Sequence, residues 1–390
     1  MYTNIEFLGT EPIENVITSM HFQMDRTIFF GYEEVIREYK KQTEDFLKKI
    51  CGVKEVLFKA VSEKDLNDVL SAMRKVIENE RAEGNKIFFD VTGGESLILV
   101  AFGMLAKEYE APMHIYDVEA DKLIELNPQD SVSIHESVKE KKVNLTLERF
   151  IKMRGAKINH DLDLHIIDTE DEVFMGYVRK LWPLMTKYKD NWNFYAGLLK
   201  KHFKPDGMYT IGTVYEDAVN DFAEFKSYMS DIAKTGVFES FRMEQLADGR
   251  KQKCIECSFY YKSLALKECL WKSGTVLELH VYEEMKHNVN DCDESVHIDW
   301  DGYIYGIPGK DVLNEIDVLC IKKNVPILIS CKSGKMDGGQ ALQPLYELET
   351  VSNRFGGRYA RKVLATLQPV TGVYADRAKE MGIELWCYGK

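Results

Sequence analysis

The stretch Asn314–Gly334, NEIDVLCIKKNVPILISCKSG, decides how the C-terminal part of the chain folds. It contains two apolar runs, Val318–Ile321 and Pro326–Ile329, on either side of a Lys-Lys-Asn turn. Short runs rich in Val, Ile and Leu that are joined by a polar turn predict a β-hairpin. The rest of the C-terminal part can be placed relative to this hairpin.

Four polar residues lie at the open end of the predicted hairpin. Because side chains alternate between the two faces of a strand, Glu315 and Asp317 share a face of the first strand. Ser330 and Lys332 share a face of the second strand in the same way. Carboxylates bind hard divalent cations, a bound cation activates water, and a lysine stabilises charge on a phosphate. A buried hairpin with solvated end charges is the alternative interpretation.

The spacing of these residues resembles the core of the PD-(D/E)XK nuclease superfamily, in which an acid on one strand precedes (D/E)-x-K on the next. Asp317 matches the first acid and Lys332 matches the lysine, while Ser330 stands where the second acid usually lies. An upstream helix supplies a further acid in this superfamily, and TVLELHVYEEMK (Thr275–Lys286) puts Glu278 there. The resemblance implies Mg²⁺ or Mn²⁺ bound by Glu278, Glu315, Asp317 and the backbone carbonyl of Cys331.

Length and composition predict a globular protein of two or three domains. The chain has 390 residues, of which 45% are hydrophobic and 29% are charged. We expect no membrane span and no signal peptide, and therefore a cytoplasmic protein with reduced, buried cysteines. The net charge of −12 argues against a surface that binds nucleic acid everywhere. The basic residues Arg354, Arg358, Arg361 and Lys362 form either a local phosphate-binding patch or an exposed helix end.

Strands and helices alternate through the N-terminal third of the chain. The predicted strands are Ile5–Leu8, Thr27–Tyr32, Val53–Ala60, Lys86–Val91 and Pro112–Val118, with an edge strand at Asp121–Leu126. The predicted helices are Ile13–Phe22, Glu33–Ile50, Lys64–Glu80 and Glu95–Tyr109. This alternation predicts a parallel, doubly wound sheet with ligands beyond the carboxyl ends of its strands.

Two loops follow predicted strands of this sheet, FLGTEPIEN (Phe7–Asn15) and FFDVTGGESL (Phe88–Leu97). Their glycines allow a ligand to approach the backbone, and hydroxyls and helix-start amides can bind phosphate or ribose oxygens. Neither loop has the Walker or the G-x-G-x-x-G spacing. A tight strand-to-helix turn without a ligand is the alternative.

The two loops together resemble the CARF domain of CRISPR-associated proteins, over roughly residues 1–145. The resemblance implies a homodimer that binds a cyclic oligoadenylate, most often the tetra-adenylate, across its twofold axis. The implied ligand residues are Gly9, Thr10, Glu11, Asn15, Thr92, Gly93, Gly94 and Ser96.

Residues 146–262 are predicted to be a connector whose helix, strand, turn and strand resemble a small winged helix. Its crowded aromatic residues predict a helical core rather than a platform for stacking bases. Residues 263–390 are predicted to be the nuclease domain, with a helix at Ser263–Lys286 broken near Gly274. The acidic run Asp291–Asp301 is predicted to be mostly a solvated loop.

The fold class is therefore α/β, with a Rossmann-like CARF domain, a connector and a restriction-endonuclease-like domain. The joint resemblance is to CARF–nuclease effectors of type III CRISPR systems. It implies that cyclic oligoadenylate activates metal-dependent cleavage of DNA or RNA. The alternatives are a DNA-repair nuclease that needs no ligand, a regulator whose nuclease is degenerate at Ser330, and a ring nuclease that breaks the cyclic ligand.

Overall fold

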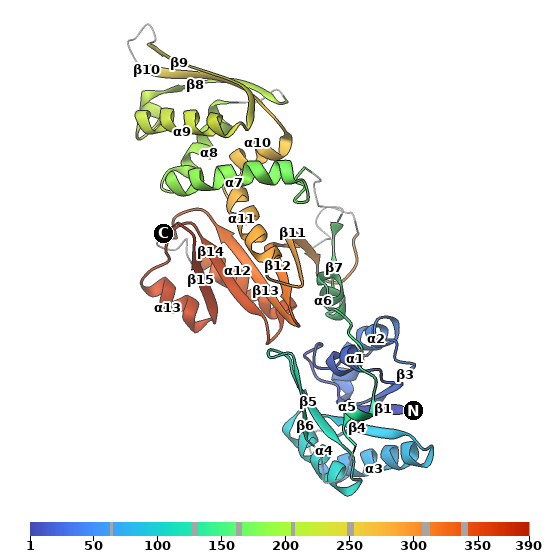
Figure 1. Ribbon diagram of the computed structural model, residues 1–390. Helices are drawn as coiled ribbons and strands as arrows, with labels where there is room; N and C mark the ends of the chain where they lie inside the picture. The colour runs from blue at the N-terminus through green and yellow to red at the C-terminus, as the bar shows by residue number, and fades with distance from the viewer. Residues whose placement is uncertain are drawn as a thin grey trace.

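The protein has three parts arranged along one long direction (Figure 1). The computed structural model describes residues 1–62, 65–126, 132–160, 166–203, 207–247, 253–305, 313–336 and 342–389. An N-terminal α/β unit lies at one end, a three-stranded sheet with helices lies at the other, and a six-stranded sheet lies between them. No helix in the described ranges is long and apolar enough to cross a membrane.

The N-terminal sheet has the strand order β3-β2-β1-β4-β5-β6, in which only β6 runs antiparallel to its neighbour. Its strands are β1 (Tyr2–Phe7), β2 (Arg26–Gly31), β3 (Glu55–Ala60), β4 (Lys86–Asp90), β5 (Met113–Asp117) and β6 (Lys122–Leu126). Its helices are α1 (Ile17–His21), α2 (Glu33–Lys49), α3 (Leu66–Ala82) and α4 (Ser96–Glu108). The predicted doubly wound sheet is confirmed.

Helix α1 is shorter than the predicted helix Ile13–Phe22, because its first residues form turns. The side chain of Asn15 bonds back to Gly9, accepting from its N–H and donating to its carbonyl at 2.9 Å each. This closes the loop after β1 and delays the start of the helix. A short polar side chain competes with helix hydrogen bonds in this way.

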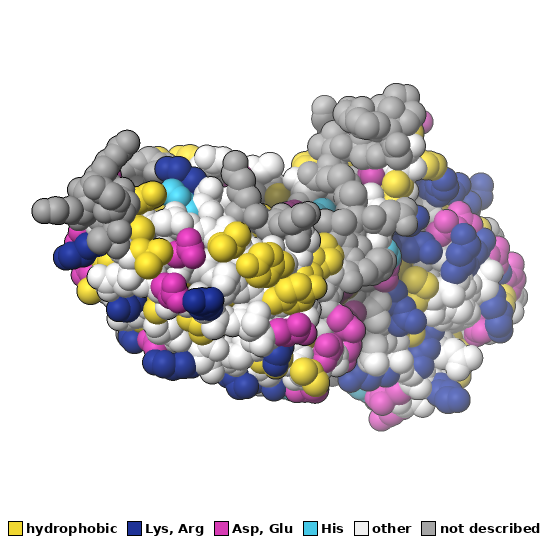
Figure 2. Space-filling view, turned by 90° about the horizontal axis from the view of Figure 1, so that it is seen from above, with side chains coloured by type: hydrophobic (Ala, Val, Ile, Leu, Met, Phe, Trp, Pro, Cys, Tyr) yellow, Lys and Arg dark blue, Asp and Glu magenta, His cyan; other side chains and the backbone are white. Residues whose placement is uncertain are grey.

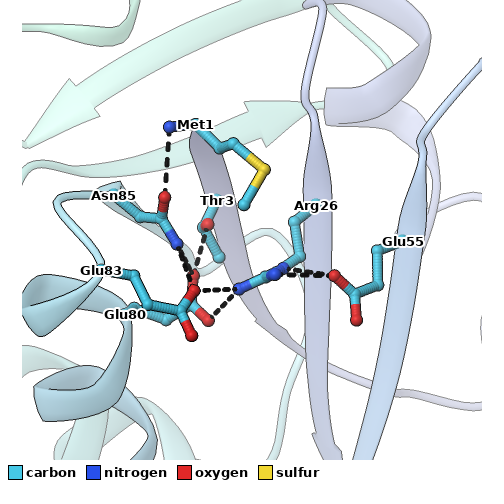
Figure 3. Close-up of polar contacts among 7 residues, drawn as sticks. All are labelled: Met1, Thr3, Arg26, Glu55, Glu80, Glu83 and Asn85. Carbon is cyan, nitrogen blue, oxygen red and sulfur yellow. Dashed lines mark hydrogen bonds and ion pairs between the residues drawn. The ribbon is translucent and has the colours of Figure 1, made fainter.

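A buried polar network holds the amino ends of the strands (Figure 3). Glu80 of α3 accepts hydrogen bonds from Thr3 at 2.8 Å and Asn85 at 2.9 Å. The same carboxylate pairs with Arg26, whose guanidinium also reaches Glu55 at 2.7 Å. The network therefore ties α3 to β1, β2 and β3 at the end of the sheet opposite the two glycine loops.

The middle part of the chain lies at the end of the molecule away from the N-terminal unit (Figure 1). It contains α7 (Glu172–Lys187), α8 (Trp192–His202), β8 (Tyr209–Tyr215), α9 (Phe222–Thr235), β9 (Phe238–Ala247) and β10 (Lys253–Tyr261), with a 3₁₀ turn at Glu216–Ala218. Its strands form an antiparallel sheet in the order β8-β10-β9. Tyr188, Trp192 and Tyr195 are buried, which confirms the predicted helical core for these residues, whereas Phe194 is 38% exposed. The likeness to a winged helix stays a prediction.

Hydrophobic side chains also lie on the outside of this three-stranded sheet, where Tyr209, Ile211 and Tyr260 are exposed. Figure 2 looks at the molecule from above Figure 1, and it shows hydrophobic side chains interspersed with acidic and basic ones on this end.

The C-terminal sheet has the order β15-β14-β13-β12-β11-β7. Its strands are β7 (Lys157–Ile158), β11 (Asp291–Asp299), β12 (Leu313–Lys322), β13 (Val325–Lys332), β14 (Arg361–Thr366) and β15 (Ile383–Cys387). The helices that accompany this sheet are α11 (Thr275–Lys286), α12 (Leu342–Val351), a π-helical turn at Ser352–Gly356, and α13 (Val373–Glu380). Helix α10 (Leu264–Trp271) instead packs against α7 and α8 at the three-stranded end (Figure 1). Two short helices, α5 (Ile134–Ser137) and α6 (Leu147–Met153), precede β7.

Two features of this sheet differ from the sequence pattern. The acidic run predicted to be a solvated loop is strand β11, which pairs with β12 on one side and β7 on the other. That prediction was wrong because Val296 and Ile298 alternate with polar residues and are buried, although few apolar residues mark the strand. Strand β7 also belongs to this sheet, because Ile158 pairs with Ile298 of β11. In the sequence β7 precedes helix α7, so the chain leaves this sheet and returns to it. The domain limits 1–145, 146–262 and 263–390 stay a prediction.

Candidate functional site

The predicted hairpin is confirmed as β12 and β13. The strands pair from Val318 with Ile329 to Lys322 with Val325, and Lys323 takes a positive φ of 58° at the turn. Asp317 and Ser330 therefore lie next to each other at the open end of the hairpin.

Asp317 is the centre of a polar group at this open end. Its Oδ2 atom accepts from the N–H of Cys331 at 2.6 Å and from the hydroxyl of Ser330 at 3.2 Å. The amine of Lys332 lies 3.3 Å from the same oxygen. The side chain of Asp317 is mostly buried, and that of Lys332 is about one third exposed. The hairpin thus brings a carboxylate, a hydroxyl and an ammonium into direct contact.

Glu278 of α11 adds a second carboxylate to the group. Burial, followed by the charges of Asp317 and Glu315, raises the pKa of Glu278 to about 8, while Lys332 acts in the opposite direction. A Cβ at Gly274 would lie 2.5 Å from Oε1 of Glu278, so this carboxylate packs on the start of its own helix.

Glu315 is placed differently from the other predicted residues. The hydroxyl of Ser295 donates to its Oε1 at 2.8 Å, and Nε2 of His297 lies 4.0 Å from its Oε2. Both partners belong to β11, and the side chain of Glu315 is more than half exposed. Glu315 therefore contributes negative charge to the group but is held at its edge.

Within the described ranges, no three His, Cys, Asp or Glu side chains are grouped so that they could hold a metal ion. Two features nevertheless fit a divalent cation. Carboxylates gather here, since the charges of Asp317 and Glu315 act together with burial to raise the pKa of Glu278. The pKa of the Cys331 thiol is raised by burial and then by Asp317, so this residue could offer its carbonyl oxygen but not a thiolate.

The two glycine loops lie side by side at the carboxyl ends of β1 and β4. These strands pair in parallel, with Glu6 opposite Asp90. Thr10, Gly94 and Ser96 are exposed, so they are accessible to a ligand. Gly94 has a φ of +140°, which only glycine adopts readily.

Other predicted ligand residues are already engaged by the protein. The side chain of Asn15 closes the loop onto Gly9. The N–H of Thr92 donates to Asp90 at 2.8 Å, and the hydroxyl of Thr92 accepts from the N–H of Tyr116 at 2.8 Å. These residues set the shape of the loops rather than offering free groups.

A buried group beneath the second loop was not found from the sequence. The hydroxyl of Thr18 donates to Oδ2 of Asp90 at 2.5 Å, and Nε2 of His114 lies 3.3 Å from the same oxygen. Burial acts to raise the pKa of Asp90, but His114, Thr18 and Thr92 hold it below its usual value. The ionised carboxylate fixes the turn that begins the second loop. A histidine within the predicted strand Pro112–Val118 was the available signal.

Glu11, the remaining predicted ligand residue, faces the C-terminal part. It pairs with Arg154, which follows α6, and it accepts from the N–H of Arg358 at 3.0 Å. A cavity of about 580 Å³ lies beside this contact, lined among others by Thr10, Arg354 and Arg358. Arg354 and Arg358 of the predicted basic cluster therefore lie next to the first glycine loop. Arg361 pairs instead with Glu384, and the amine of Lys362 donates to the carbonyl of Met381.

Residues 268–388 match the family model of the Card1-like endonuclease domain. This segment contains the whole polar group around Asp317, including Glu278 and Lys332. The nuclease predicted from the hairpin is supported by this match. No curated protein matches the chain.

Solved structures share the fold of the whole chain. Protein VC1899 from Vibrio cholerae is 18% identical, with a TM-score of 0.72 over 99% of this chain and 94% of that one. Can2 from Sulfobacillus thermosulfidooxidans, solved with cyclic tetra-adenylate, is 14% identical, with a TM-score of 0.66 over 99% of this chain and 95% of that one.

A type III CRISPR defence DNA nuclease activated by cyclic oligoadenylate is 12% identical, with a TM-score of 0.51 over 95% of this chain and 49% of that one. These likenesses confirm the predicted fold class. The chain shares its overall fold with these structures, and residues 268–388 of it match a Card1-like endonuclease domain.

Proposed function

We propose that this protein is a metal-dependent nuclease that cleaves DNA or RNA when cyclic oligoadenylate binds to its N-terminal domain. The observation that carries the proposal is the contact of Asp317 with Ser330, Cys331 and Lys332 inside the segment that matches an endonuclease domain. The same chain carries two glycine loops on a CARF-like sheet, and Thr10 of the first and Gly94 and Ser96 of the second are exposed.

The nuclease site would act on a phosphodiester through charge. Asp317, Glu278, Glu315 and the carbonyl of Cys331 would hold Mg²⁺ or Mn²⁺, which supplies Lewis-acid chemistry when bound. Lys332 would stabilise the negative charge that develops on the phosphate. Ser330, in the position of the usual second acid, donates to Asp317 and orients its carboxylate.

The activator site would lie on the two glycine loops. The exposed Thr10, Gly94 and Ser96 would contact the ligand, together with Gly9 and Gly93. The proposed activator is cyclic tetra-adenylate, because Can2 was solved in complex with that ligand. Thr92, Glu11 and Asn15 would support the pocket through the contacts described above.

A homodimer is part of the proposal. Helix α4 begins at the second loop and leaves Val100 and Met104, one helical turn apart, 53% and 47% exposed. A twofold axis beside this apolar strip would place the two activator sites together, which suits a cyclic ligand with repeated units. We place the protein in the cytoplasm, as expected from the sequence.

The test is a cleavage assay on single-stranded DNA, supercoiled plasmid and RNA. Each substrate is incubated with Mg²⁺ or Mn²⁺, with and without cyclic tetra-adenylate, and Lys332→Met serves as the inactive control. We expect cleavage only in the presence of the ligand, and the nucleic acid that is cut identifies the substrate. Cleavage without the ligand would favour a constitutive repair nuclease.

Ser330 favours one further candidate, a regulator whose nuclease is degenerate. That protein would bind cyclic tetra-adenylate but cut none of the substrates with either metal. Linear adenylate products formed without metal would instead indicate a ring nuclease.

A further inference from the structure

Two buried glutamates join the first glycine loop to the C-terminal part. Glu11 bonds to Arg154 and to the N–H of Arg358. Glu14, only 5% exposed, accepts from the hydroxyl of Tyr359 at 2.6 Å and pairs with Arg358 at 2.6 Å. Burial raises the pKa of Glu14, while Tyr359 and Arg358 favour its ionised form.

The two oxygens of Glu14 face different parts of the molecule. Tyr359 and Arg358 both contact Oε1. The other oxygen, Oε2, lies 2.6 Å from the position that a Cβ of Gly93 would occupy. It also lies 4.0 Å from the corresponding position at Gly9. One carboxylate therefore packs against both glycine loops and, through its other oxygen, bonds to the C-terminal part.

The glycine at position 93 is explained by this packing. A methyl group there would also lie 3.1 Å from Cβ of Glu14, which is backbone-proximal and cannot swing away. A displacement of the second loop toward Glu14 must consequently move Glu14, because the contact leaves no free space.

The segment that Glu14 contacts leads directly to the nuclease site. It follows the π-helical turn Ser352–Gly356 and precedes β14, which pairs in parallel with β13. Thr366 of β14 is opposite Lys332. A Cβ at Gly356 would lie 3.1 Å from Leu328 of β13, so the turn also packs on that strand. Movement at Tyr359 thus reaches the strand that carries Lys332 through packed neighbours.

We propose that Glu14 is a positioning residue that couples the second glycine loop to the nuclease domain through Arg358 and Tyr359. It touches neither the substrate nor the reacting atoms. The inference rests on the proposed function for the identity of the activator. Coupling of this kind requires the activator to bind two arrangements of the Glu14 contacts with different affinity.

The test is hydrogen exchange of the full chain with and without cyclic tetra-adenylate, combined with the cleavage assay. The variant is Tyr359→Phe, which removes only the hydroxyl that donates to Glu14 and accepts from Arg358 at 2.7 Å. The matched control is Tyr346→Phe on α12, where the side chain is exposed and packs on Arg377. Equal thermal unfolding of the two variants would show that Tyr359→Phe is folded.

In the wild type we expect the activator to slow exchange at 92–96 and to change exchange at 356–361. In Tyr359→Phe the first response should stay and the second should largely disappear. The activator-stimulated cleavage rate should fall at least about tenfold, because the lost hydroxyl bonds to two charged groups, Glu14 and Arg358. Tyr346→Phe should behave like the wild type.

The outcomes separate this inference from the proposed function. An unchanged response at 356–361 both in Tyr359→Phe and in Glu14→Gln, which removes the charge that pairs with Arg358, would overturn the role of Glu14 while leaving activator binding intact. If the wild type shows both exchange responses but cuts no substrate, the proposed nuclease activity is wrong. The exchange of residues 356–361 in the variants would still test whether Glu14 couples the two parts. No response at 92–96 in the wild type would overturn both.

Discussion

Replacing Asp317 with asparagine should abolish cleavage and leave the fold almost as stable as before. The change keeps the shape of the side chain and removes its charge. An asparagine Oδ1 can still accept the N–H of Cys331, which now bonds at 2.6 Å. The ion pair with Lys332 is lost, but a pair this accessible to water contributes only about 1 kcal/mol.

A second effect opposes that loss. The charge of Asp317 is, after burial, the largest cause of the raised pKa of Glu278. Removing that charge lowers the pKa of Glu278 toward its usual value, so holding this buried carboxyl in the folded state costs less free energy. We therefore expect the free energy of unfolding to change by less than about 1 kcal/mol. The cleavage rate should fall at least about a thousandfold, which corresponds to roughly 4 kcal/mol of transition-state stabilisation.

Urea unfolding and cleavage by the same preparations measure the two quantities. The matched control is Asp376→Asn, since Asp376 is exposed in the first turn of α13 and far along the chain from the hairpin. It should keep the wild-type rate. A folded Asp317→Asn protein that retains more than about a tenth of the wild-type rate would refute the assignment of the active site.

Three further predictions concern the loops, the metal and the strand ends. Gly94→Ala forces an alanine to φ +140° with its Cβ 3.0 Å from Leu99, so titration calorimetry should show at least about tenfold weaker binding of cyclic tetra-adenylate. Gly84→Ala, at φ +74° in open space, is the control that should leave binding unchanged. Chelation by EDTA should stop cleavage, added Mn²⁺ or Mg²⁺ should restore it, and persistent cleavage in EDTA would contradict a metal site. Arg26→Met strands the buried Glu80 and should lower the free energy of unfolding by about 3 kcal/mol in urea, without changing activator affinity.

The features that the sequence predicted are those that depend on neighbours along the chain. Alternation in β12 and β13 placed Asp317 and Lys332 on converging faces, and a tight turn fixed the pairing. The glycines after β4 likewise marked a strand-to-helix turn. Periodicity and turn chemistry act over a few residues, so one sequence is enough to read them.

The features that were missed depend on residues far apart in the chain. Thr18, Asp90 and His114 come from three elements, and no local pattern brings them together. Glu14 meets Tyr359 across 345 positions. Contacts of this kind follow from how whole units pack, which neither propensity nor periodicity encodes. Strand β11 was missed for a related reason, because its burial comes from two neighbouring strands rather than from its own composition.

The position of β7 at the edge of the C-terminal sheet has a consequence for how the protein is made. Its partner β11 is encoded more than a hundred positions later, since Ile158 pairs with Ile298. A ribosome adds roughly 5–20 residues per second, so β7 emerges several seconds or more before its partner exists. The helices and strands of the middle part are synthesised in that interval and can fold first. Completion of the nuclease sheet is then a late step in biogenesis, and a stalled or truncated chain would expose an unpaired strand edge.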